Sequence, residues 1–184
     1  MIPKIKNILY ATDLSANSAY AFRYAMNSAA RHGAVVHILH VLENRIPVFG
    51  LPAEDGTGFL EQGPAYVRKL RKAEARRKKR ARDTIRKRLE DFCREELRGD
   101  ADLLRRVVSV DVREGNPADR IAARADELLP DLIIVGSHRK GSIVHALSGS
   151  VAEKIVHRTR VPVFIVPLPG KTVVHQLQPQ PTLA

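Results

Sequence analysis

The fold of this chain can be worked out from one segment, Asp131-Leu-Ile-Ile-Val-Gly136-Ser-His-Arg-Lys-Gly141-Ser-Ile-Val-His-Ala-Leu-Ser-Gly149-Ser150-Val151. It opens with a short apolar run, Leu132 to Val135, which predicts a strand buried on both faces. A loop with three glycines follows. Ser150 then stands three residues before Glu153, as in a capping box, so a helix is predicted to begin there.

The start of this predicted helix suits an anion. The first helical turn has unpaired N–H groups at the positive end of the helix dipole. Gly149 permits close approach to the backbone, and Ser150 adds a hydroxyl group. Strand, glycine loop and capped helix together indicate a phosphate-binding loop. The alternative is that the glycines serve only the geometry of the turn.

Outward from this segment, strands and helices alternate along the chain. Strands are predicted at 5–11, 34–42, 106–113, 132–135 and 161–166, and helices at 16–32, 65–98, 117–129 and from 150 onward. This alternation predicts an α/β fold, a parallel sheet with helices on both faces. Ligands of such sheets bind at the carboxyl ends of the strands.

Length and composition narrow the class of protein. The 184 residues fit one domain, predicted over 1–167, with an irregular loop at 43–64 and a flexible tail at 168–184. The single cysteine, Cys93, excludes an internal disulfide and a cysteine-based metal cluster. No apolar run reaches the ~18 residues that a membrane span needs. We expect a cytoplasmic protein.

The positive charge is concentrated in one segment. Between Pro64 and Arg88 there are 13 Lys or Arg against Glu74 and Asp83, which accounts for the whole net charge of +11. A continuous helix over 65–98 would be roughly 50 Å long, whereas a domain of this size is about 35–40 Å across. We therefore expect the part after Ala81 to dock and the basic part, 65–80, to project.

Two interpretations of the basic segment stay open. One is a solvated helix face, the commonest role of a run of charge. The other is contact with an acidic protein or a nucleic acid through Arg68–Arg88. No aromatic residue lies inside that range, which argues against specific reading of a single strand.

Several short motifs together resemble the universal stress protein family. The resemblance covers about 140 of the 184 residues and identifies a single-domain member with a basic insertion. It implies an adenine nucleotide alpha hydrolase-like fold with strand order 3-2-1-4-5. The motifs are Ala11-Thr-Asp13-Leu-Ser15, Val41, Arg113-Glu-Gly-Asn-Pro117, Gly136-Ser-His, Gly149-Ser150-Val-Ala-Glu153 and Val161-Pro-Val163.

The resemblance also implies a site for ATP, with or without Mg²⁺, at the ends of the first and fourth strands. Each residue has a simpler alternative role: Asp13 as a local cap, His138 as a surface residue, Ser150 as a plain helix cap. The candidate nucleotide-binding residues are Thr12, Asp13, Val41, Gly136, His138, Arg139, Gly141, Gly149, Ser150 and Val151.

Arg139 departs from the family pattern G-x2-G-x9-G-(S/T), in which its position is glycine. Its side chain would either obstruct the sugar and phosphates or, with Lys140, bind the phosphates through charge-assisted hydrogen bonds. Gly141 lies two residues beyond and is not equivalent.

No catalytic constellation is recognisable. The chain lacks Gly-x4-Gly-Lys-(Ser/Thr) and the Ser-Gly-Gly motif of ATP pyrophosphatases. We expect ATP to be a regulatory ligand in a stress response, with at most slow hydrolysis. The alternative is a member that binds no nucleotide and acts through its basic arm.

The last predicted strand also suggests an assembly. Pro162 within this apolar strand indicates an edge position, so a homodimer through Val161–Val166 is expected.

Overall fold

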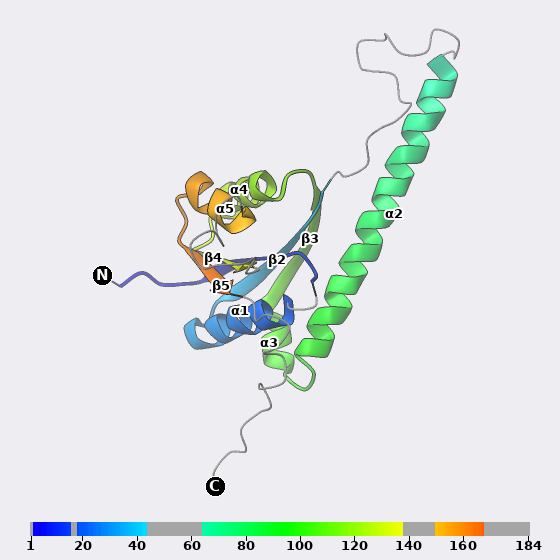
Figure 1. Cartoon of the computed structure of the whole chain (residues 1–184). Helices are drawn as coiled ribbons and strands as arrows, with labels where there is room; N and C mark the ends of the chain where they lie inside the picture. The colour runs from blue at the N-terminus through cyan, green and yellow to red at the C-terminus, as the bar shows by residue number, and fades with distance from the viewer. Residues whose placement is uncertain (1, 16–17, 44–63, 138–149, 168–184) are drawn as a thin grey trace.

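The computed structural model describes residues 2–15, 18–43, 64–137 and 150–167. Five strands and five helices follow one another along these residues (Figure 1). In chain order they are β1 (Asn7–Thr12), α1 (Ser18–His32), β2 (Val35–Leu42), α2 (Pro64–Glu96), α3 (Ala101–Arg106), β3 (Val107–Glu114), α4 (Pro117–Leu128), β4 (Leu132–Ser137), α5 (Val151–Arg158) and β5 (Val163–Pro167).

The strands form one parallel sheet in the order β3-β2-β1-β4-β5. The expected α/β fold with order 3-2-1-4-5 is confirmed. Helices α1, α2 and α3 lie on one side of the sheet, and α4 and α5 lie on the other (Figure 1). The expected loop 43–64 falls outside the described residues, apart from its first and last positions, and so does the expected tail 168–184.

Strand β1 is buried on both faces, because it lies at the centre of the sheet. Ile8 and Tyr10 pack with α1 and α2, whereas Leu9 and Ala11 pack with α4 and α5. All four side chains are buried. This is the continuous apolar pattern of a central parallel strand.

Three aromatic rings join the sheet to α1 and α2. The ring of Phe22 lies 5.6 Å from that of Tyr10 and 5.1 Å from that of Phe92. The Tyr10 hydroxyl donates a 2.9 Å hydrogen bond to the carbonyl of Ser18, at the start of α1. Burial raises the pKa of Tyr10, so this hydroxyl stays protonated and remains a donor.

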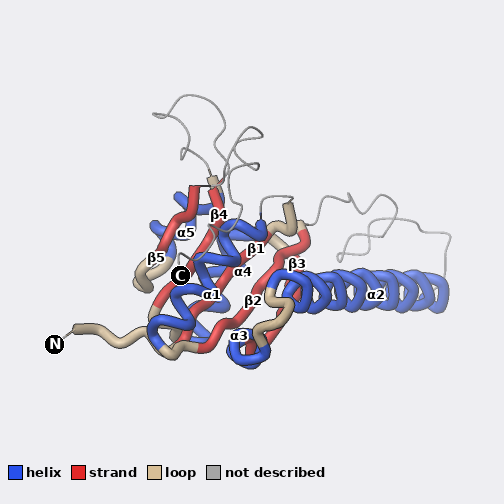
Figure 2. The backbone as a smooth tube through the Cα atoms, turned by 90° about the horizontal axis from the view of Figure 1, so that it is seen from below, coloured by secondary structure: helices blue, strands red, loops and turns tan. Residues whose placement is uncertain are grey.

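Helix α2 has 33 residues and is about 50 Å long. Its C-terminal half packs on the sheet through Ile85, Leu89, Phe92 and Cys93. Its N-terminal half extends past the other elements (Figures 1 and 2). No helix in the described part of the chain is long and apolar enough to cross a membrane.

Lys78 and Arg82 mark the last point at which α2 meets the sheet. Their side chains lie 3.9 and 3.8 Å from the carboxylate of Glu114, the final residue of β3. Lys78 also pairs with Glu74 at 3.1 Å, one turn earlier on the same helix. Salt bridges therefore replace apolar contacts where the helix leaves the domain.

Most observed elements begin or end one or two residues from the predicted bounds, and two differences have a clear local cause. The short helix α3 was not expected; Asp100 caps it by accepting a 2.9 Å hydrogen bond from the N–H of Leu103. Strand β5 begins at Val163 rather than Val161. Pro162 has no N–H to give the ladder, and its carbonyl accepts from the N–H of Ile133 at 2.9 Å. β5 is nevertheless an edge strand, as Pro162 indicated.

Candidate functional site

The candidate site lies where the order of the strands reverses, between β1 and β4. Ala11 pairs with Val135 and Thr12 pairs with His40, so β1, β2 and β4 end close together. At the opposite ends of β1 and β4, Asp131 Oδ2 accepts hydrogen bonds from the N–H groups of Lys6 and Asn7, at 2.7 and 2.9 Å. These bonds lower the pKa of Asp131 and hold the register.

A tight turn follows β1 and carries Asp13. Thr12 Oγ1 accepts from the N–H of Leu14 at 3.2 Å, and Asp13 Oδ1 accepts from the N–H of Ser15 at 2.9 Å. Leu14 has a φ of 56°, in the left-handed region that non-glycine residues seldom adopt. Asp13 thus makes a local bond to the backbone, as its simpler alternative supposed, but this bond ends at Ser15 and does not cap α1, which begins at Ser18; the Asp13 side chain is exposed.

His40 also lies at the carboxyl ends of the strands, and the sequence showed no sign of its role there. Its side chain is buried at the end of β2. Nδ1 lies 2.8 Å from the carbonyl oxygen of Thr12 and must donate to it, since a carbonyl only accepts. The contact joins β2 to the turn that carries Asp13. Only the strand register pairs these two residues, and a single sequence does not display that register.

The other candidate residues at the carboxyl ends of the strands come from β2, β4 and α5. Val41 lies near the end of β2, and Gly136 is the penultimate residue of β4. Ser150 Oγ caps α5 by accepting from the N–H of Glu153 at 3.1 Å, which confirms the predicted helix start. Val151 opens α5 and is 39% exposed. His138, Arg139, Gly141 and Gly149 lie outside the described residues.

This edge has polar groups suited to a sugar or phosphate. The Ser15 hydroxyl is buried and has no hydrogen-bond partner within the described part of the chain. The N–H groups of Val151 and Ala152 belong to the first turn of α5, where helices leave donors unpaired. The Asp13 carboxylate and the N–H groups of α5 are an acceptor and donors of the kinds that sugars and phosphates bond.

Neither a metal cluster nor the cavity on α2 provides a better site. Among residues 2–15, 18–43, 64–137 and 150–167, no group of three His, Cys, Asp or Glu could hold a metal ion. A cavity of about 330 Å³ lies beside Ala73, Arg76, Arg77 and Arg80 on α2. The described residues that line this cavity all belong to α2, and none of them is a candidate nucleotide-binding residue.

A second cluster of charges lies between β3 and α4. Arg113 bonds both carboxylate oxygens of Glu127, at 2.7 and 2.6 Å. Arg124 bonds Glu127 at 2.9 Å and Asp111 at 2.5 Å. Hydrogen bonds from Arg113 and then Arg124 lower the pKa of Glu127 to about 2. The charges are mutually satisfied, so we assign this cluster to the attachment of α4 rather than to chemistry.

Comparison with known proteins agrees with the fold and identifies a family. The sequence model described as "Universal stress protein family" matches residues 4–167. Universal stress protein MJ0531 of Methanocaldococcus jannaschii is 28% identical over 166 residues, which cover 90% of this chain and 84% of that protein.

Solved structures share the fold. Universal stress protein UspA from Lactobacillus plantarum has a TM-score of 0.55 at 24% identity and covers 90% of this chain and 99% of its own. A universal stress protein crystallised in complex with cAMP has a TM-score of 0.50 at 20% identity and covers 91% of this chain and 100% of its own. The family match spans all five strands of the sheet, and this chain therefore belongs to the universal stress protein family.

Proposed function

We propose that this protein binds an adenine nucleotide, ATP, at the carboxyl ends of β1 and β4 and uses it as a regulatory ligand in a stress response. The observation that carries the proposal is the convergence of the Asp13 turn with the end of β4 at the point of strand reversal. That is where open α/β sheets bind ligands. The related protein solved with cAMP supports an adenine nucleotide as the class of ligand.

Each group at the carboxyl ends of the strands has a defined role in this proposal. The Asp13 carboxylate accepts hydrogen bonds from the ribose or adenine, and the backbone of Val41 borders the base. The N–H groups at the start of α5, with the Ser150 hydroxyl, face the phosphates. Within the described residues no carboxylate cage could hold Mg²⁺, so any Mg²⁺ would be bound mainly by phosphate oxygens and water.

The Arg139 side chain in the glycine loop could have either of two opposite effects on ATP binding. If its side chain obstructs the sugar, Arg139→Gly strengthens ATP binding. If its guanidinium binds the phosphates, the same substitution weakens ATP binding. We favour the second effect, because an arginine beside Lys140 adds two cations to the loop that faces the phosphates.

Calorimetric titration of ATP, with and without Mg²⁺, tests the proposal. We expect micromolar affinity, weakened about tenfold or more in Asp13→Ala, which corresponds to about 1.4 kcal/mol. The matched control is Asp126→Ala, which removes an exposed carboxylate from α4 and should leave affinity unchanged. Absence of binding heat at millimolar ATP in both the original protein and Arg139→Gly would refute the nucleotide site.

Hydrolysis is not the proposed activity. The described residues of the site supply acceptors and N–H donors but no nucleophile paired with a base. We expect any turnover of ATP to be slow, and we propose that the protein works in the cytoplasm.

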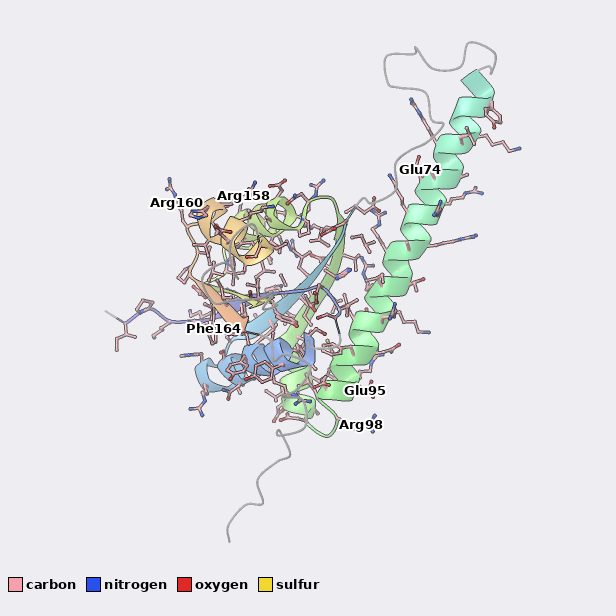
Figure 3. The ribbon with its side chains drawn as sticks, in the orientation of Figure 1. Glu74, Glu95, Arg98, Arg158, Arg160 and Phe164 are labelled. Carbon is pink, nitrogen blue, oxygen red and sulfur yellow. The ribbon has the colours of Figure 1, made fainter. Side chains whose placement is uncertain are left out.

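A homodimer through the region of Val161–Val166 is the proposed assembly. β5 is an edge strand, and Phe164 on it is 39% exposed and touches the ring of Tyr24 from α1 (Figure 3). We expect light scattering to give twice the chain mass of 20.5 kDa. Phe164→Asp should halve that mass, whereas Tyr66→Asp, an exposed aromatic residue on α2, should not. A monomeric original protein would contradict the assembly.

A further inference from the structure

The basic part of α2 presents its cations in an ordered pattern. Lys69, Arg76, Arg80 and Lys87 are all exposed and fall within about 40° of one another around the helix axis. They form a row about 27 Å long. The row points away from the stripe that faces the sheet, which contains Lys78, Arg82, Ile85 and Leu89.

Cations also flank this row on both sides. Arg77 and Arg88 lie on one flank, and Lys79 and Arg86 lie on the other, about 60–100° from the row. All four side chains are exposed, and none forms an ion pair with another described residue. The arm therefore offers positive charge over a wide arc of its surface, in contrast to Lys78 and Arg82, which are held by Glu114.

The composition of this surface favours neither an apolar protein interface nor insertion into a membrane. The buried cores of protein interfaces are depleted of charged residues, and amphipathic helices enter membranes through an apolar face. On α2, Tyr66 is the one exposed large apolar or aromatic side chain among the described residues, and it lies before the row begins. The rest of the chain has equal numbers of basic and acidic residues, so a second copy offers no net negative charge to the arm.

A polyanion with charges at regular intervals satisfies all of these features. An α-helix is about 10–12 Å in diameter, which matches the ~12 Å major groove of B-form DNA. The major groove of an RNA duplex is too narrow for side chains to enter. A helix in the DNA groove would direct its two cationic flanks toward the phosphates of the two strands. The free N-terminal half of α2 meets no other described element that would block such an approach (Figure 2).

From these observations we infer that the basic arm of α2, Arg68–Arg88, binds double-stranded DNA through its phosphate backbone, independently of base sequence. The arm has no aromatic side chain for stacking on bases, and its cations extend along the helix on several sides, an arrangement suited to phosphate contacts, which carry no sequence information. The contact would be governed by counterion release and would weaken steeply with salt.

Fluorescence anisotropy with a labelled DNA duplex of about 24 base pairs, in about 50 mM salt without ATP, tests this inference. The arm variant carries Arg76→Gln, Arg77→Gln, Lys79→Gln and Arg80→Gln; glutamine keeps the helix propensity of the replaced residues. We expect affinity to fall at least about tenfold, and the slope of log K against log salt to become shallower by about 3.

A matched control removes four exposed cations elsewhere: Lys4→Gln, Arg31→Gln, Arg98→Gln and Arg160→Gln. It has the same net charge as the arm variant and should bind within about threefold of the original protein. Two duplexes of unrelated sequence should bind equally, and an RNA duplex or a single strand should bind less tightly. Asp13→Ala should bind DNA normally, which separates this test from that of the nucleotide site.

Three results would overturn the inference. The first is no binding of duplex DNA by the original protein at low salt. The second is equal loss of binding in the arm variant and the charge-matched control. The third is binding of an RNA duplex or of poly-glutamate as tight as that of DNA, which would assign the arm to a different polyanion.

Discussion

Replacing Phe22 by alanine is expected to lower the free energy of unfolding by about 3–5 kcal/mol. The Phe22 side chain is fully buried on α1, and its ring contacts both Tyr10 of β1 and Phe92 of α2. The substitution removes the transfer free energy of the ring and leaves a cavity that three different elements would have to move to fill. Such a change is a large share of the 5–15 kcal/mol that stabilises a typical domain.

Urea unfolding followed by circular dichroism measures this effect. The matched control is Tyr66→Ala, which removes an aromatic ring that is 48% exposed on the free half of α2. Its cost should stay under about 0.5 kcal/mol, the range of surface substitutions. Equal changes in the two variants would show that Phe22 does not join these elements as the ring contacts indicate.

Replacing Leu89 by aspartate is the second change with a large expected effect. Leu89 is fully buried and belongs to the core formed with Val112 and Phe22. Aspartate removes that packing and brings a carboxylate into a fully buried apolar core. We expect a loss of more than about 4 kcal/mol and release of the docked half of α2 from the sheet.

Limited digestion with trypsin distinguishes local release from general unfolding. In the original protein, cleavage after Arg86, Lys87 or Arg88 requires opening of a packed helix and should be slow. In Leu89→Asp, these bonds should be cut at least about tenfold faster, because local opening becomes favourable. Ala81→Asp, at an exposed position on the same helix, is the matched control and should keep the original rate. Unchanged protection in Leu89→Asp would mean that other contacts hold α2.

The sheet could be predicted from sequence because its signals are local. The apolar run Leu132–Val135, the cap at Ser150 and the Asn116-Pro117 helix start each belong to a few adjacent residues, and the structure places elements at all three. The strand order came from the family resemblance, not from the residues themselves. Non-local pairing, such as Thr12 with His40, leaves no mark in one sequence.

The features that the sequence did not predict depend on segments too short to show a pattern or on contacts between distant residues. Helix α3 has six residues, too few for a clear apolar period, and its start depends on Asp100 as a cap. His40 matters because its imidazole reaches across to the carbonyl of Thr12, a contact between residues 28 positions apart. The role of Arg139 also depends on contacts across the fold, and it stays a prediction that the ATP titration tests.

The two edges of the sheet are covered differently, and this has a consequence for assembly. Helix α2 lies along β3, joined to it by Glu114 and by the core around Val112, whereas no described element lies beside the outer edge of β5 (Figure 1). A neighbouring β5 could extend the sheet at β3 only by displacing α2. If the proposed homodimer forms through β5, we therefore expect its assembly to stop at two chains related by a twofold axis, because α2 covers the β3 edge that head-to-tail addition would need.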